Sequence, residues 1–302
     1  MKIIIKLNLI KDSNIDLNKN MPCVFDTDEN SPTFIFVDGS YFTFYRYFSL
    51  MTWWKNAYPE NPLTDPFQNE QFVEKFRKTF VENLEKIPKN LGIDKTCKPF
   101  MFVGKDCPRE TIWRMQLFAD YKKNRANGPE DGFMGGPFFK MAYEDQLFQK
   151  GGARAILKYP TLEADDCIAI SVKYILDMYP NCAVYIVTSD KDYLQLVEPR
   201  VKIFDLKFKN IAEQKSSAGN PKADLFCKIV MGDSSDNIPS VIKKCGPKTA
   251  LKCFENPEYF ADRLKKENAY EIYERNKKLV DFSNIPENLI NDFINTHIKT
   301  KT

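Results

Sequence analysis

Four short acidic segments contain the residues of this chain that are best suited to chemistry. Each follows an apolar run or opens a predicted helix, positions at which an α/β fold brings distant side chains together. Gathered carboxylates repel one another, and a divalent cation that prefers hard oxygen ligands relieves this repulsion. The sequence therefore predicts a site for Mg²⁺ or Mn²⁺ built from Val37-Asp38-Gly39, Glu163-Ala164-Asp165-Asp166, Ser189-Asp190-Lys191-Asp192 and Gly232-Asp233-Ser234-Ser235-Asp236-Asn237.

Each segment has an ordinary structural explanation when it is taken alone. An Asp-Gly pair after a strand is usually a turn, and the helix dipole favours acidic residues in a first helical turn. Residues 232–237 fit a simple turn at the end of a helix. Four such segments in one chain, all placed at strand ends or helix starts, make the metal site the stronger interpretation.

The sequence offers few residues for histidine-dependent or cysteine-dependent catalysis. The chain has one histidine, His297, and none of its eight cysteines forms a Cys-x-x-Cys pair. A zinc site and a Ser-His or Cys-His nucleophile are therefore not expected. The base that activates a nucleophile must be a metal-bound hydroxide, a carboxylate or a lysine. Scattered cysteines in apolar surroundings indicate reduced thiols, typical of an intracellular location such as the cytoplasm or a replication site.

Composition predicts a globular protein with an uneven charge distribution. The chain has 302 residues, 43% of them hydrophobic, and a net charge of +3. Basic residues concentrate in 105–125 and 243–265, which favours a polyanionic partner, although ordinary solvated helix faces are the alternative. No apolar run has the length of a membrane span, and the first residues lack a signal-peptide pattern, so no membrane association is expected.

Alternating apolar runs and amphipathic segments predict an α/β fold with a mostly parallel sheet flanked by helices. Thr161 is expected to cap a helix that runs to about Met178. No strand signal follows the polar segment 214–220. We predict an N-terminal extension over 1–30, an α/β domain over 31–215 and a helical domain over 216–302, with strands at 33–37, 98–103, 183–188 and 201–204.

Three of the acidic segments, taken with their neighbours, resemble motifs of the 5′-nuclease family. This family contains flap endonucleases, phage 5′→3′ exonucleases and the 5′-nuclease domain of DNA polymerase I. The resemblance covers about residues 34–255 and implies a PIN-like sheet with a helical arch and a C-terminal helix–three-turn–helix. It is carried by Glu163-Ala164-Asp165-Asp166, by Val187-Thr188-Ser189-Asp190-Lys191-Asp192-Tyr193-Leu194-Gln195-Leu196, and by Gly232-Asp233-Ser234-Ser235-Asp236-Asn237-Ile238-Pro239 leading into Cys245-Gly246-Pro247-Lys248-Thr249-Ala250.

The resemblance implies two divalent ions with separate ligand sets. Two cations roughly 4 Å apart can activate water and neutralise the leaving oxygen of a phosphodiester without histidine. The implied ligands are Asp38, Glu163 and Asp165 for one ion and Asp190, Asp192 and Asp233 for the other, with Asp166 and Asp236 in the ligand shell or beside it.

The basic segment 109–125 resembles the gateway helix of the family. By this resemblance Lys122 and Arg125 contact the scissile phosphate, and Arg114 lies about two turns earlier on a similar face. Tyr121 would stack on the terminal base, and Lys123 belongs to the same nucleic-acid-binding segment. The loop that follows, up to Gly136, would form an arch for a single strand.

Residues 238–254 resemble the helix–three-turn–helix, which holds a duplex phosphate without reading sequence. Gly246 allows close approach of the phosphate backbone, and a potassium ion on backbone carbonyls is implied there. The implied contacts, all sensitive to salt, come from Lys243, Lys244, Gly246, Lys248 and Thr249.

Two positions depart from the family pattern. Relatives commonly place an aspartate at the end of the second strand, where this chain has Val103. Either Asp106 reaches the site from a shifted loop, or the first ion has one ligand fewer. The turn over 240–246 is also poorer in glycine and about one residue longer than in relatives.

We therefore expect a Mg²⁺-dependent 5′ nuclease that cuts DNA at 5′ ends or flaps, and RNA primers in RNA–DNA hybrids are a further expected substrate. A catalytically weakened scaffold that binds branched DNA remains open because of Val103. A PIN-type endoribonuclease is the other alternative, although it does not need the helical hairpin after residue 232. We expect a monomer, with a sliding clamp or single-strand-binding protein as candidate partners.

Overall fold

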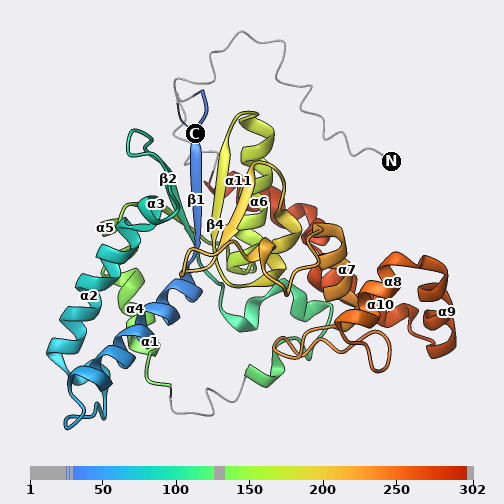
Figure 1. The fold of residues 1–302 in the computed structure, drawn as a ribbon, viewed down its shortest axis with the longest axis horizontal. Helices are drawn as coiled ribbons and strands as arrows, with labels where there is room; N and C mark the ends of the chain where they lie inside the picture. Colours follow the sequence, from blue (N-terminus) through green and yellow to red (C-terminus); the bar gives the residue numbers. More distant parts are fainter. Residues whose placement is uncertain (1–24, 26, 28–29, 126–132, 298–302) are drawn as a thin grey trace.

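The computed structural model of the protein describes residues 25, 27, 30–125 and 133–297 (Figure 1). Almost all of the expected extension over 1–30 lies outside this part of the chain. Residues 126–132, the centre of the expected arch, lie outside it as well.

Apolar runs form a five-stranded parallel sheet in the described residues, with strand order β3-β2-β1-β4-β5. The four predicted strands are present, and the fifth, β3, lies at the edge beside β2. The strands are β1 (Thr33–Asp38), β2 (Phe100–Gly104), β3 (Ala153–Leu157), β4 (Ala183–Val187) and β5 (Val201–Phe204).

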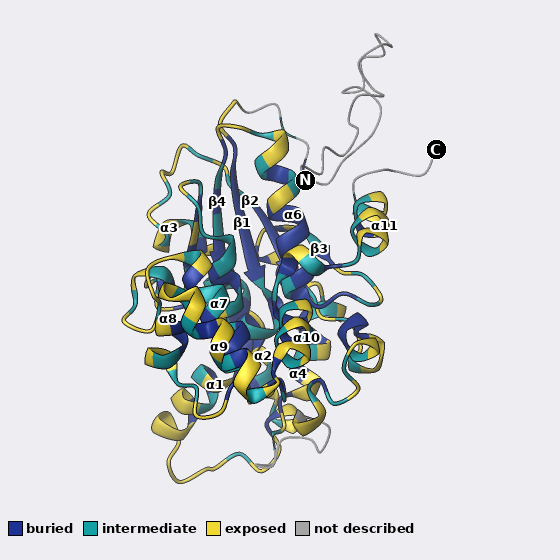
Figure 2. Ribbon diagram, turned by 90° about the vertical axis from the view of Figure 1, so that its right-hand side faces the viewer, coloured by how far each residue is buried: buried dark blue, intermediate teal, exposed yellow. Residues whose placement is uncertain are grey.

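Helices cover both faces of the sheet (Figure 1). Alternate residues of β1 point to opposite faces, so Phe34 and Phe36 pack with α6 and α11, whereas Ile35 and Val37 pack with α1, α2, α4 and α5. The strands are dark with burial in Figure 2, as expected for a parallel sheet covered twice. The helices are α1 (Gly39–Ala57), α2 (Glu70–Glu85), α3 (Ile87–Asn90), α4 (Gly136–Glu144), α5 (Leu147–Lys150), α6 (Ala164–Met178), α7 (Pro221–Met231), α8 (Pro247–Glu255), α9 (Pro257–Glu267), α10 (Tyr270–Val280) and α11 (Glu287–His297).

The start of α6 differs from the prediction. Glu163, not Thr161, is the N-cap residue, and its backbone N–H donates to the Asp166 carboxylate at 3.2 Å. The hydroxyl of Thr161 is buried without a hydrogen-bond partner. The acidic segment therefore helps to close the helix end by itself, because the N3 residue Asp166 accepts from the backbone N–H of the N-cap residue.

The expected gateway helix over 109–125 is wrong for this structure. The segment forms three short 3₁₀ turns, η2 (Arg109–Thr111), η3 (Trp113–Gln116) and η4 (Lys123–Arg125). Lys122 has a φ of 54°, a left-handed conformation that a continuous helix does not contain. Buried polar contacts of this segment, described below, outweigh its helix propensity.

The C-terminal region is helical, as predicted, but it is not separate from the sheet throughout. Helices α7 to α10 pack around one small apolar cluster of their own and a second that they share with Ile112 and Tyr121. The chain then returns, and Phe282, Ile285 and Phe293 join the core on the α6 face. Helix α11 therefore belongs to the α/β layer, which differs from the predicted division at 216.

Among the described residues, no helix combines the length and the apolar character that crossing a membrane requires.

Candidate metal-dependent nuclease site

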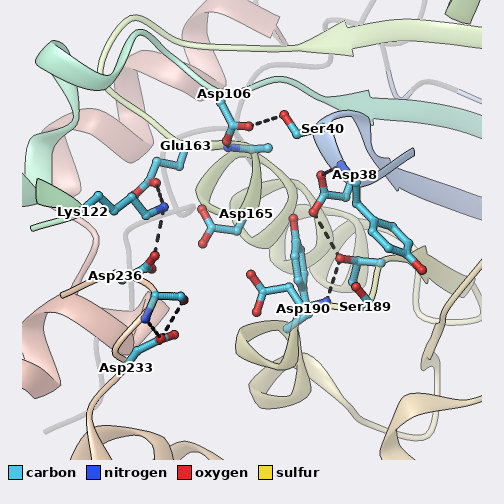
Figure 3. A pocket seen from close by; sticks show the side chains of 15 residues that line it. Asp38, Ser40, Asp106, Lys122, Glu163, Asp165, Ser189, Asp190, Asp233 and Asp236 are labelled. Carbon is cyan, nitrogen blue, oxygen red and sulfur yellow. Dashed lines mark hydrogen bonds and ion pairs between the residues drawn. The ribbon is translucent and has the colours of Figure 1, made fainter. Parts of the chain in front are cut away.

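The carboxyl ends of the strands border an acidic cavity of about 350 Å³ (Figure 3). Its walls come from segments far apart in the sequence, because parallel strands all end at the same edge of the sheet. Seven carboxylates and, among the described lining residues, a single ammonium face it: Asp38, Asp106, Glu163, Asp165, Asp190, Asp233 and Asp236, with Lys122.

Asp38 lies where β1 ends and α1 begins. Its carboxylate accepts hydrogen bonds from the Tyr41 backbone N–H at 3.0 Å and from Thr188 Oγ1 at 3.1 Å. Burial, followed by repulsion from Asp106, raises the pKa of Asp38 to about 7. The hydrogen bonds thus hold the Asp38 side chain in place, while burial and Asp106 disfavour its ionised form. A bound cation would favour that form.

Asp106 lines the cavity, whereas Val103 does not. In the sheet Val103 pairs with Val37 and is fully buried in the core, so it does not reach the cavity. Asp106, from the loop after β2, accepts hydrogen bonds from Ser40 Oγ at 2.6 Å and from the Ala164 backbone N–H at 2.9 Å. Both donors belong to segments of the site, and they hold Asp106 at the edge of the cavity beside Ser40 (Figure 3).

Arg114 and Asp166 lie behind the cavity. The two carboxylate oxygens of Asp166 accept from Arg114 Nη1 and Nη2, each at 2.7 Å, and Trp113 Nε1 adds a third bond at 2.9 Å. Arg114 is 2% exposed and also contacts Glu163 at 3.0 Å. Both groups are buried and fully hydrogen-bonded, so Arg114 does not share an open face with Lys122. The place of Asp166 in or beside a ligand shell stays a prediction.

Lys122 and Tyr121 reach Glu163 from the opposite side. The Lys122 ammonium pairs with Glu163 and lies 3.7 Å from Asp236, whereas the Tyr121 hydroxyl donates to Glu163 at 3.0 Å. Burial alone would raise the pKa of Glu163, but Lys122 and Arg114 outweigh it and hold that pKa below its usual range. Tyr121 is 3% exposed, so its ring does not offer the expected stacking surface in this conformation.

The second acidic group is organised by a lysine that sequence reasoning missed. Lys228, from α7, places its ammonium 2.7 Å from Asp192 and 2.5 Å from Asp233. Asp190 caps η5 (Lys191–Leu196) and accepts from the Asp192 backbone N–H at 2.9 Å. Burial and then Asp190 raise the pKa of Asp192 to about 7, although Lys228 opposes the rise. Only the spacing of Lys228, five residues before Asp233 on a helix that leads into the site, could have indicated its role.

The donors and charges of the cavity fit hard divalent cations. Every lining carboxylate offers oxygen, which suits Mg²⁺ or Mn²⁺. Burial and then Asp166 raise the pKa of Asp165 well above its ordinary value, and it has no ion-pair partner among the described residues. Two carboxylate groups have ligand atoms within 4.8 Å of one another, namely Glu163, Asp165 and Asp166, and Asp192, Asp233 and Asp236.

The loop 233–237 joins the cavity to the expected helix–three-turn–helix. Asn237 Nδ2 donates to the Asp120 carbonyl at 2.8 Å, and Asn124 Nδ2 donates to the Ser234 carbonyl at 2.7 Å. The loop thereby carries Asp233 and Asp236 to the cavity while its far end leads into the hairpin. The acidic centre and the hairpin are one connected unit.

The hairpin itself presents its cations to solvent. Gly246 caps α8, and a side chain at this position would meet no atom within 4 Å, so the N-terminus of the helix is open. Lys243, Lys244 and Lys248 are exposed, and Thr249 is half-buried. Lys123 is exposed on the neighbouring segment, whereas the side chain of Arg125 lies outside what the structure describes.

Comparison with known proteins identifies the family. The family model described as 5′-3′ exonuclease, N-terminal resolvase-like domain, matches residues 33–220. The chain belongs to this family. The match includes β1 to β5 and the carboxylates from Asp38 to Asp192, and the resemblance expected from the sequence is thereby confirmed.

Relatives of this family match over different lengths. The 5′-3′ exonuclease of Buchnera aphidicola subsp. Schizaphis graminum is 30% identical over 240 residues, 77% of this chain and 74% of that protein. The DNA polymerase I of Lactococcus lactis subsp. cremoris is 33% identical over 192 residues, 61% of this chain but only 20% of that protein. The chain thus spans a small part of the polymerase.

A solved structure supports the same fold. The T5 D15 protein, co-crystallized with metal ions, superimposes with a TM-score of 0.61 at 18% identity, covering 88% of this chain and 98% of that chain. At this identity the likeness concerns the fold. The predicted fold, a PIN-like parallel sheet flanked by helices, is confirmed.

Proposed function

We propose that this protein is a structure-specific 5′→3′ exonuclease or flap endonuclease that hydrolyses phosphodiester bonds of DNA with two divalent cations, Mg²⁺ or Mn²⁺. One observation carries the proposal: seven carboxylates from distant segments of the chain converge beside a helical hairpin with exposed lysines. Membership of the 5′-3′ exonuclease family supports the reaction. RNA primers in RNA–DNA hybrids are a second proposed substrate, since nothing in the hairpin contacts requires a deoxyribose.

Different residues of the chain would bind the cations and the phosphate. One ion would be held by Asp38, Glu163 and Asp165, with Asp106 in the place that Val103 leaves, and the other by Asp190, Asp192 and Asp233. When bound, such cations neutralise the charge that develops on the phosphate. The Lys122 ammonium contacts Glu163 beside these ligands. It can leave that carboxylate and bind an oxygen of the phosphate instead.

Duplex binding is assigned to the hairpin. Lys243, Lys244, Lys248 and Thr249 surround the open N-terminus of α8 at Gly246, which favours a phosphate through its backbone N–H groups. A potassium ion at the turn, and a clamp or single-strand-binding protein as recruiter, remain predictions. The hairpin also argues against the PIN-type endoribonuclease, and Asp106 argues against a silent scaffold.

The test is cleavage of a 5′-labelled flap duplex in Mg²⁺, with EDTA as the metal control. Asp190→Ala/Asp192→Ala removes two carboxylates of the second group. Asp145→Ala, at an ion pair with Arg77 outside the cavity lining, is the matched control. Metal-dependent cutting near the junction by wild type and Asp145→Ala, lost in the double variant, is expected.

Two other results would select the alternatives. Tight flap binding without cutting in Mg²⁺ and in Mn²⁺ would identify a scaffold. Cutting of single-stranded RNA that lacks a junction would identify an endoribonuclease. Asp106→Asn adds a specific test of the first ion, because it should raise the Mg²⁺ concentration needed for half-maximal cleavage while leaving flap binding unchanged.

A further inference from the structure

Lys228 occupies the position between two carboxylates of the second acidic group. It projects from α7, one turn before the helix ends at Gly232, and its side chain is 22% exposed. Its ammonium lies 2.7 Å from Asp192 Oδ1 and 2.5 Å from Asp233 Oδ2. The other oxygen of Asp233 is taken by the backbone N–H and the hydroxyl of Ser235, both at 2.7 Å. Both carboxylate oxygens of Asp233 therefore already have a partner.

The first acidic group is different. Among the described residues, neither Asp38 nor Asp165 has an ion-pair partner, and Asp106 accepts only neutral donors. Lys122 contacts Glu163, but it leaves the other carboxylates of this group unneutralised. A cation that arrives there competes with basic side chains only at Glu163, which Lys122 and Arg114 contact.

We propose that Lys228 is an internal cation that competes with a divalent ion for Asp192 and Asp233, so that the two acidic groups fill unequally. An ion that binds the second group must displace an ammonium that bridges two of its carboxylates. In the first group only Glu163 is held by cationic side chains, and among the described residues Asp38 and Asp165 have no ion pair to break. The second group therefore fills at a higher metal concentration than the first. Without metal, Lys228 keeps its two carboxylates together. The proposal rests on the proposed two-ion function.

Mn²⁺ binding to the full chain, without DNA, tests this directly. Electron paramagnetic resonance of free Mn²⁺ and calorimetry would be applied to wild type, Lys228→Met, Lys228→Gln and the control Lys222→Met. Lys222 is exposed on the same helix, so its replacement removes the same charge without touching the site. Wild type and Lys222→Met are expected to bind one Mn²⁺ tightly and a second weakly. In both Lys228 variants the second dissociation constant should fall by about tenfold, since a charge-assisted contact no longer opposes the ion.

Thermal melting gives a second readout that does not depend on binding stoichiometry. In EDTA, Lys228→Met should melt at a lower temperature than wild type, because Asp192 and Asp233 repel each other without the ammonium. Mn²⁺ should then raise its melting temperature by more than it raises that of wild type. Lys228→Gln keeps hydrogen-bonding capacity and should fold even where Lys228→Met does not.

The outcomes separate the two proposals. If wild type binds no Mn²⁺, the two-ion function itself fails. If wild type binds two ions but the second constant in both Lys228 variants is unchanged or weaker, Lys228 positions the carboxylates for metal and competition is overturned.

Discussion

Arg114 shows how a single residue can organise an active site without facing it. Its guanidinium pairs with Asp166 and Glu163 and donates to the Leu279 carbonyl at 2.7 Å. It therefore ties the start of α6 to the end of α10 under the floor of the cavity. Surrounding carboxylates outweigh the effect of its burial, and the pKa of Arg114 stays well above its ordinary value, so the charge is permanent.

Replacement of Arg114 by methionine should destabilise the protein strongly. Asp166 would remain buried and unpaired, a situation that typically costs about 3–5 kcal/mol. Chemical denaturation would measure the loss. Lys123→Met, which removes a charge at an exposed ion pair, is the control and should cost at most about 1 kcal/mol. An equal loss in both variants would show that Arg114 is not a structural anchor.

The pKa values of Asp38 and Asp192 predict that stability depends on pH in the absence of metal. Both are raised to about 7, chiefly by burial and next by a neighbouring carboxylate. The folded protein therefore binds protons that the unfolded chain releases near its lower pKa, and stability falls as pH rises from about 4 to about 7. In EDTA the melting temperature should decrease across this range.

Asp38→Asn serves as the control for this pH dependence. It should lessen the decrease, because the amide has no acidic proton to lose and gains no charge as the pH rises. Saturating Mg²⁺ should also lessen the decrease, because the bound ion favours the ionised carboxylates. A melting temperature that is flat, or that rises with pH, in EDTA would show that these carboxyls titrate normally.

At the scale of secondary structure, the sequence was sufficient wherever apolar runs determined the element. Four strands and the helix after Glu163 follow from hydrophobic pattern. The edge strand β3, Ala153–Leu157, was missed because it starts with alanine and carries an exposed arginine. Its pattern is too weak for a buried strand, and only pairing with β2 fixes it.

The carboxylates that line the cavity were predictable from the sequence, but the basic side chains that contact them from behind were not. The position of an acidic residue at a strand end already indicates a site. In the sequence, Lys228 and Arg114 look like ordinary basic residues on a solvated surface. Their roles depend on contacts across 36 to 165 residues of chain, as in the pairs Lys228–Asp192 and Arg114–Leu279. Tyr121 was misjudged for the same reason, since its hydroxyl is drawn inward to Glu163.

The hairpin gives a prediction about salt. If Lys243, Lys244 and Lys248 each contact a phosphate, alanine at any one should weaken duplex binding and lower the slope of log affinity against log salt by about 0.9. Fluorescence anisotropy in Ca²⁺ at several NaCl concentrations would measure both. Lys158→Ala, which removes an exposed lysine that follows β3 and lies outside the hairpin, is the control. An unchanged slope in all three hairpin variants would place the duplex elsewhere.

For the whole molecule, metal and stability should be coupled. Millimolar Mg²⁺ should raise the melting temperature, because it binds the folded carboxylate cluster and not the unfolded chain. Asp190→Ala/Asp192→Ala should reduce that gain. A wild-type melt that is insensitive to Mg²⁺ would mean that the convergent carboxylates do not bind the ion.

The return of the chain to the α6 face has a mechanical consequence. The helical segment α8–α10 is held on both sides. The loop 233–237 before it bonds Asp120, and after it Gln195 donates to the Val280 carbonyl and accepts from the Phe282 N–H. A segment that is held at two points cannot rotate as freely as one that is connected by a single hinge. The distance from the hairpin to the acidic cavity is then fixed. If the hairpin binds a duplex as proposed, this distance determines which bond of the duplex reaches the cavity.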